Sequence, residues 1–158
     1  MYKDSGLSLL ELLVVMLLVS LIATFGLPWT SHWYQDKIAW VMQKDIEQAI
    51  EHGIQESEIL GEPLRLVPLR DKDWLNGMAL VRESDLTDPH HPILYAWPWR
   101  TTAYHVLWHG FLSDTYLRFT PDMSQASLNG YFLIESSTLR VKMMVNRVGR
   151  VREIKTAL

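Results

Sequence analysis

The apolar positions of this chain follow three successive patterns, and the first is the simplest. Residues 7–27 form an almost unbroken apolar run. As a helix they would extend about 30 Å, which is the thickness of the hydrocarbon core of a bilayer. The run shows no polar face, whereas a buried helix of a globular domain normally shows one. We therefore predict one membrane-spanning helix over residues 7–27.

The second pattern covers residues 28–59, where apolar residues recur in steps of three to five and charged residues occupy the other positions. This spacing indicates an amphipathic helical stalk. Gly53 and the sequence Gly61-Glu62-Pro63 indicate where that helix ends. Trp40 suits either a membrane interface or contact with protein, and we favour plain packing for it.

The third pattern covers residues 64–158 and consists of short runs rich in β-branched and aromatic residues, separated by Pro, Gly, Asn and Asp. Such runs are typical of strands joined by turns. The runs read LRLVPL, GMALV, AYHVLWHGFL, TYLRFT, GYFLIE and LRVKMMV. We therefore predict an α+β protein whose long N-terminal helix packs on a sandwich-like antiparallel β-sheet head.

Charge is distributed unevenly in this weakly acidic chain. The sequence has 15 Lys and Arg, 18 Asp and Glu, and a net charge of −3. Six basic residues nevertheless lie within residues 139–158, where Glu153 is the one acidic residue. Such asymmetry can mark a contact with a polyanion, and it can also arise by chance. The absence of cysteine excludes disulfides and thiolate metal sites.

Glu11 interrupts the apolar run, where an ionised carboxylate is unfavourable unless it is paired. A position near the interface would keep it hydrated. Alternatively, a cut after Gly6 would make Leu7 the new N-terminus, and Glu11 could then pair with the amino group of a neighbouring subunit. We favour pairing. Lys3, in the short flank before the run, favours a cytoplasmic N-terminus.

The segment KDSGLSLLELLVVMLLVSLIA resembles the signal of type IV pilins and type II secretion pseudopilins. In those families a short basic leader ends in glycine, as at Gly6, and glutamate is the fifth mature residue, as at Glu11. Leu7 replaces the usual phenylalanine. The resemblance implies that prepilin peptidase removes residues 1–6 and methylates Leu7, and that Glu11 serves assembly.

The same resemblance implies where the protein acts and with what. The chain would wait in the bacterial inner membrane, with its N-terminus in the cytoplasm and its head in the periplasm. It would then enter a filament at the cell surface. The implied partners are other major and minor pilins, prepilin peptidase and the inner-membrane assembly platform.

The head resembles the GspH/FimT group of minor pilins in several short stretches. The segment WLNGMALV carries Trp74 and Gly77 of one shared motif. A second motif is matched by Phe119, Pro121, Asn129, Gly130 and Phe132. The chain departs from the group at Asp122-Met123, where a glycine is common, and it lacks a cysteine that many relatives carry.

The C-terminal sequence NRVGRVREIKTAL follows a strand with an apolar face of Leu139, Val141, Met143 and Val145. Gly149 provides the backbone freedom that a turn or bulge needs. Arg150 and Arg152 are two residues apart, so in an extended chain they point the same way, about 7 Å apart. Their planar guanidinium groups can each grip a phosphate with two hydrogen bonds.

The sequence Gly149-Arg150-Val151-Arg152 also resembles the G-R-x-R motif of the FimT branch, which is associated with DNA uptake in natural transformation. The resemblance implies that Arg150 and Arg152 contact the phosphate backbone of double-stranded DNA. Arg147, Lys142 and Lys155 are candidate auxiliary contacts. Binding of this kind would not depend on base sequence.

Two other interpretations of the basic tail stay open. Basic residues often protect an edge strand against unwanted pairing. If the hairpin placed Lys142 opposite Glu153, that lysine would leave the basic cluster. The chain would alternatively be a structural pseudopilin of the H type, which helps to initiate or cap a type II secretion filament, since relatives of that kind can also end in a Gly-Arg turn.

Other candidate chemistry is weaker. His90 and His91, near Asp85 and Asp88, could be drawn as a metal site but suit an exposed loop better. His105 and His109 have the ligand spacing of a helix, although their segment reads as a strand. The aromatic segment 95–100 offers a possible platform for single-stranded bases or for adhesion, formed by Tyr95, Trp97, Trp99 and Arg100. We expect no enzymatic activity, cofactor or metal.

Overall fold

The structure is a computed structural model that describes residues 9–70, 73–87, 92–101, 103–122, 124–137 and 139–157. The predicted cleavage site at Gly6 and Leu7 lies outside these residues, as do His90 and His91. The chain divides into two compact units, residues 1–38 and residues 39–158. One helix, α1, runs from Leu9 to Leu60 through both units.

Helix α1 ends one residue beyond the predicted end of the stalk. Gly61 follows with φ of 68°, and its N–H donates to the carbonyl of Ser57 at 3.0 Å, which is a common helix termination. The prediction that Gly53 helps to end the helix was wrong, because α1 continues through it. In the part of the chain that the structure describes, no helix has the length and hydropathy of a membrane span.

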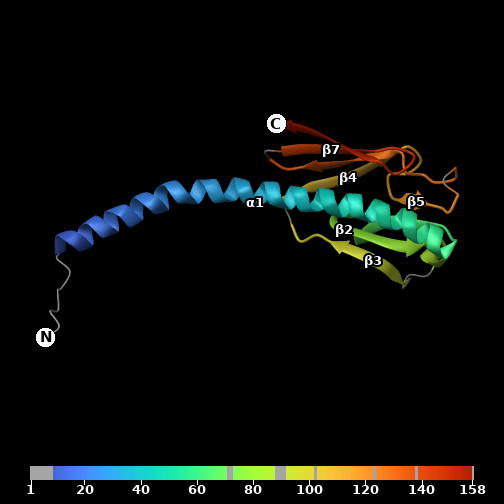
Figure 1. The fold of residues 1–158 in the computed structure, drawn as a ribbon, viewed down its shortest axis with the longest axis horizontal. Helices are drawn as coiled ribbons and strands as arrows, with labels where there is room; N and C mark the ends of the chain where they lie inside the picture. The colour runs from blue at the N-terminus through green and yellow to red at the C-terminus, as the bar shows by residue number, and fades with distance from the viewer. Residues whose placement is uncertain are drawn as a thin grey trace. The chain divides into compact units, whose positions relative to one another are not determined.

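The head contains two four-stranded antiparallel sheets (Figure 1). The first has the order β3-β2-β1-β5, with the bounds β1 Leu64–Arg70, β2 Asp73–Arg82, β3 Ile93–Pro98 and β5 Leu117–Phe119. The second has the order β4-β6-β7-β8, with the bounds β4 His105–Gly110, β6 Gly130–Glu135, β7 Leu139–Val145 and β8 Val151–Ala157. A short 3₁₀ helix, η1, spans Glu83–Thr87. The α+β prediction is confirmed.

The second half of α1 packs over both sheets, with β4 and β7 on one side of it and β2 and β3 on the other in Figure 1. Its buried positions recur with helical period, as expected for a helix with one face on a core. The apolar ones are Ala39, Met42, Ile46, Ala49 and Ile50. Trp40 lies off this face and is 57% exposed, so it does not pack on the head, and its packing on a neighbouring subunit stays a prediction.

Gly53 lies on α1 where the helix meets β5. A Cβ atom on this glycine would be 2.5 Å from the ring of Phe119, which is itself buried. The glycine therefore allows close approach of helix and strand rather than helix termination. Across the head, the Trp74 ring of β2 meets the Phe132 ring of β6 edge to face at 5.3 Å, which joins the two sheets.

An ion-pair network joins β1, β5 and η1. Arg65 and Arg118 both donate to the carboxylate of Glu83, and the Arg118 Nε–Oε2 distance is 2.7 Å. Burial alone would raise the pKa of Glu83, but the hydrogen bonds from Arg118 and Arg65 outweigh it and lower that pKa from its ordinary value. Glu83 is therefore ionised near neutral pH and holds the edge strand β5 in place.

The structure also contains β3, an edge strand that we did not predict. Pro98 ends it, and an edge strand tolerates proline because one side of its backbone needs no partner. Trp99, just after β3, is buried, and its indole Nε1 donates to Asp45 Oδ2 of α1 at 2.8 Å. Tyr95 stacks on His52 of α1, with ring centroids 5.3 Å apart.

Candidate functional site

The turn between β7 and β8 is organised by Asn146. Its side-chain oxygen accepts hydrogen bonds from the backbone N–H of Val148 at 3.1 Å and of Arg150 at 2.8 Å. Its backbone N–H donates to the carbonyl of Arg150 at 3.0 Å. The cluster Asn146-Arg147-Val148-Gly149 indicated a turn, and asparagine commonly shapes turns through such side-chain bonds, but the role of the Asn146 side chain was not predicted. The asparagine fixes the backbone from which Arg150 projects.

Gly149 satisfies two requirements of this turn. Its φ of 77° lies in the left-handed region, as expected for a glycine in a turn. A Cβ atom at this position would also lie 2.4 Å from Cδ1 of Ile54 on α1. The predicted turn at Gly149 is therefore present, and it rests directly against the helix.

The register of the hairpin decides which side chains share a face. Val145 pairs with Val151, so Met144 lies opposite Arg152 and Lys142 opposite Ile154. Glu153 lies opposite Met143, not Lys142, so the pairing that would have removed Lys142 from the basic cluster does not occur. The reason is the five-residue connection between Val145 and Val151, since a one-residue shift of register moves every side chain to the other face.

Alternation therefore gives the second sheet two different faces. The face toward α1 is apolar and includes Phe132, Val141 and Met143. We call the opposite side the outer face; it carries the residues Tyr131, Lys142, Met144 and Arg152. Arg150 and Arg152 are both exposed, so they are accessible to a ligand in solution.

A groove of about 890 Å³ lies over the turn end of the second sheet. Both arginines line it, together with His109 at the end of β4. Among the described residues that line this groove, none is Asp or Glu. The groove is therefore a basic depression, and an anion entering it meets no lining carboxylate.

Lys142 and His109 both contact the ring of Tyr131. Lys142 Nζ lies over that ring, 3.8 Å from its centroid, in the geometry of a cation–π contact. The imidazole of His109 approaches the same ring from β4, with centroids 4.9 Å apart. Because β4 and β7 flank β6, these two contacts come from opposite sides of Tyr131.

Arg147 has a different environment from the two groove arginines. Its Nη2 donates to the carbonyl of Ser124 at 2.8 Å, so it ties the turn to the segment before β6. In that segment, hydrogen bonds from Ser124 and Gln125, with the charge of Arg147, hold the pKa of Asp122 below its ordinary value. Lys155 pairs with Val141 in the hairpin register, and the side chain of Lys155 is not among those described.

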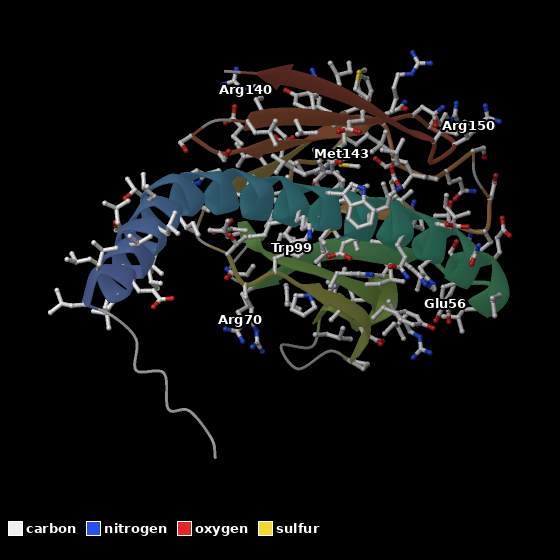
Figure 2. All side chains as sticks on the ribbon, turned by 60° about the vertical axis from the view of Figure 1, so that its left-hand side comes forward. Glu56, Arg70, Trp99, Arg140, Met143 and Arg150 are labelled. Atoms are coloured by element: carbon white, nitrogen blue, oxygen red, sulfur yellow. The ribbon has the colours of Figure 1, made fainter. Side chains whose placement is uncertain are left out.

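At the other end of the second sheet, Arg140 pairs with Glu135 directly across the strands β6 and β7. Figure 2 shows Arg140 and Arg150 toward opposite ends of this sheet. The positive charge of Arg140 is therefore compensated locally, whereas no Asp or Glu is among the described residues that line the groove with Arg150 and Arg152.

The aromatic segment 95–100 is used mainly to dock β3 on α1. Trp99 is buried against Asp45, and Tyr95 and Trp97 both contact the His52 ring. Trp99 is therefore unavailable for base stacking. His105 and His109 lie on strand β4, and the described residues contain no group of three or more metal-ligating side chains.

Glu11 lies in the first turn of α1, where the helix dipole favours a negative charge. The apolar side chains around Glu11 are exposed on all sides of the helix. Leu9, at one end of this stretch, is 80% exposed, and Ile22, at the other end, is 71% exposed. A helix that is apolar all round is normally covered by lipid or by other helices. Glu11 therefore lies on an exposed, apolar stretch of α1.

Comparison with known proteins adds two findings. Residues 1–27 match the family model described as the prokaryotic N-terminal methylation motif. The crystal structure of the type IV minor pilin FimU from Pseudomonas aeruginosa matches with a TM-score of 0.56 and 14% identity, over 79% of this chain and 95% of that chain. The fold is that of a type IV pilin. A second crystal form of FimU matches with a TM-score of 0.49 and 14% identity, over 75% of this chain and 96% of the other.

No curated protein sequence matches the chain. The pilin fold agrees with the predicted fold class, and the methylation motif covers the predicted leader, its cleavage site and Glu11. The resemblance of the head to the GspH/FimT group and the role of the G-R-x-R motif stay predictions. Within this pilin fold, Arg150 and Arg152 lie at the turn end of the second sheet.

Proposed function

We propose that this chain is a minor pilin of a type IV filament that it enters through its N-terminal helix. The match of residues 1–27 to the methylation motif is the observation that carries this proposal. Prepilin peptidase would cut after Gly6 and methylate Leu7, and Glu11 would pair with the N-terminus of a neighbouring pilin. The inner-membrane assembly platform would then insert the subunit, and the exposed apolar side chains of α1 would be covered by neighbouring helices.

Processing provides a direct test. Mass spectrometry of the protein expressed with and without prepilin peptidase should show a mature chain that begins at methylated Leu7 only when the peptidase is present. A Gly6→Val variant should keep residues 1–6. An unprocessed chain in the presence of an active peptidase would contradict the filament role.

We further propose that the head binds extracellular double-stranded DNA, without sequence preference, during natural transformation. The basic groove supports this, since two exposed arginines line it and none of its described lining residues is acidic. Phosphate contacts of this kind position DNA but carry no base information. A few cations give weak binding per subunit, and several copies in one filament would raise it through avidity.

A salt titration with full-length protein in mild detergent tests DNA binding. The protein is mixed with labelled duplexes of unrelated sequence, and the variant Arg150→Ala/Arg152→Ala is compared with it. Arg70→Ala/Arg100→Ala is the matched control, since it removes the same charge at exposed residues outside the groove; Figure 2 shows Arg70 well away from Arg150. We expect binding that weakens with salt, is lost in the groove variant and is kept in the control. Absence of binding at low salt would overturn the proposal.

A structural pseudopilin of a type II secretion system is the second candidate. It is favoured by the environment of the turn, where Arg147 bonds to Ser124 and Gly149 packs on Ile54, so that part of the basic motif serves the fold. Under this alternative the groove arginines would bind no DNA and would contribute to filament initiation or capping. Neighbouring secretion genes and normal transformation after Arg150→Ala/Arg152→Ala would favour it.

A further inference from the structure

We infer that the DNA path on the head runs obliquely across the outer face of the second sheet, from Arg150 through Arg152 to Lys142, and ends before Arg140. This inference rests on the proposed DNA binding and deepens it. It assigns Lys142 as the third phosphate contact, Tyr131 as the residue that positions Lys142, and the Arg140–Glu135 pair as the boundary of the path. The ligand it specifies is the phosphate backbone of a duplex.

The register of the hairpin makes the path continuous. Arg152 lies opposite Met144, and Lys142 is two residues further from the turn on the same face of β7. With strands about 4.8 Å apart and a two-residue rise of about 7 Å, the backbone positions of Arg152 and Lys142 are about 8 Å apart. Arg150 precedes Arg152 by a similar step. The backbone positions of the three residues therefore advance away from the turn, while the ammonium of Lys142 lies over Tyr131, which is opposite Met144 on β6.

The cation–π contact with Tyr131 fixes the third cation. Lys142 Nζ lies 3.8 Å from the ring centroid, and His109 supports the ring from the other neighbouring strand at 4.9 Å. A lysine side chain that is already ordered loses less rotamer freedom when it binds a phosphate. Tyr131 therefore acts through Lys142, as a positioning residue.

The same contact argues against recognition of single-stranded bases. A base that stacked on Tyr131 would have to displace the lysine from the ring face. The aromatic ring is thus occupied by protein, while the charged ends of Arg150 and Arg152 stay exposed. This arrangement suits backbone phosphates, which duplex DNA presents on its outside.

The Arg140–Glu135 pair limits the path at the far end of the sheet. Arg140 follows the same outward alternation as Lys142, but its guanidinium is bound to the carboxylate of Glu135 on the neighbouring strand. A phosphate at that place would meet a neutral pair instead of a cation. Removing the carboxylate should therefore lengthen the path by one contact.

The test compares salt dependence of duplex binding by full-length variants. Lys142→Ala should make the slope of log K against log salt shallower by about 0.9, the value for one phosphate contact. Tyr131→Leu should weaken binding about two- to fivefold without any change of charge, and Tyr131→Phe should restore it because the ring is kept. Glu135→Gln should steepen the slope by about 0.9, and Glu135→Gln/Arg140→Ala should cancel that gain.

The possible failures are distinguishable. If Arg150→Ala/Arg152→Ala abolishes binding but Lys142→Ala and Glu135→Gln leave affinity and salt slope unchanged, DNA binding stands and the path is wrong. If the unaltered protein binds no duplex, the proposed function and the path both fail. A preference of the unaltered protein for single strands over duplex would also overturn the path. Thermal unfolding of each variant identifies losses of DNA affinity that are caused by misfolding. The steeper salt slope expected for Glu135→Gln cannot arise from misfolding.

Discussion

Gly149 in the β7–β8 turn lies so close to α1 that a Cβ atom there would be 2.4 Å from Cδ1 of Ile54. The turn that carries Arg150 is therefore seated directly on the helix. Ile50 and Leu128 complete the contact, at 3.3 and 3.6 Å from the same position. The placement of the groove arginines thus depends on how tightly hairpin and helix pack.

Substitution of this glycine should be destabilising for two reasons. Gly149→Ala should lower the free energy of unfolding by about 2–3 kcal/mol, because alanine disfavours a positive φ and its methyl group meets Ile54. Gly61→Ala is the control, since Gly61 also has a positive φ of 68° but has open space around it. Gly61→Ala should lower the free energy of unfolding by about 1 kcal/mol. Equal losses in denaturant titrations would show that the helix contact contributes nothing.

Gly53→Ala should destabilise the head although alanine is the better helix former. The gain in helix propensity is about 1 kcal/mol, and the clash with the buried Phe119 ring should cost about 2–3 kcal/mol. We expect a net loss of about 1–2 kcal/mol in denaturant titrations. The double variant Gly53→Ala/Phe119→Leu should lose less than the sum of the two single variants. Simple additivity would contradict the close approach.

Trp99→Phe should loosen the end of β3 by removing the hydrogen bond to Asp45. We expect a loss of about 1.5–3 kcal/mol, the usual range for a bond to a charged group. Asp45→Asn keeps an acceptor oxygen and should lose less. Hydrogen exchange should show increased opening confined to residues 93–98 and the facing turn of α1. An unchanged exchange pattern would show that β3 is held by other contacts.

Glu83→Gln should reduce stability at neutral pH and have little effect in acid. The pKa of Glu83 is lowered in the folded state, so its ion pairs stabilise the fold above its ordinary value of 4.5, and that stabilisation is lost as the pH falls through the lowered pKa. At pH 7 the expected loss is about 1.5–3 kcal/mol, since bonds from Arg65 and Arg118 are weakened.

The measurement for Glu83 is a set of denaturant titrations from pH 7 to pH 3. The difference between the unaltered protein and Glu83→Gln should shrink below pH 4.5. Glu58→Gln, at an exposed position of α1, should change stability little at either pH. A difference that stayed constant down to pH 3 would show that Glu83 acts through packing rather than through its charge.

Several features of the protein follow from the order of its residues alone. The apolar run with Glu11 is a linear pattern, and the methylation motif that matches residues 1–27 is linear too. The alternation of Leu139 to Val145 was sufficient to predict the buried and outer faces of β7, because side chains in a strand point alternately to its two sides. Gly149 indicated a turn because glycine readily adopts a positive φ, which it has in the structure.

Contacts between residues far apart in the chain were decided only by the tertiary structure. No local pattern shows that Gly53 receives the Phe119 ring or that Trp99 bonds to Asp45, because each contact depends on how the helix lies over strands formed much later in the chain. The register of the β7–β8 hairpin was likewise decided only by the tertiary structure. The length of the β7–β8 turn places Lys142 opposite Ile154 rather than Glu153, so that Arg152 and not Glu153 shares the outer face with Lys142.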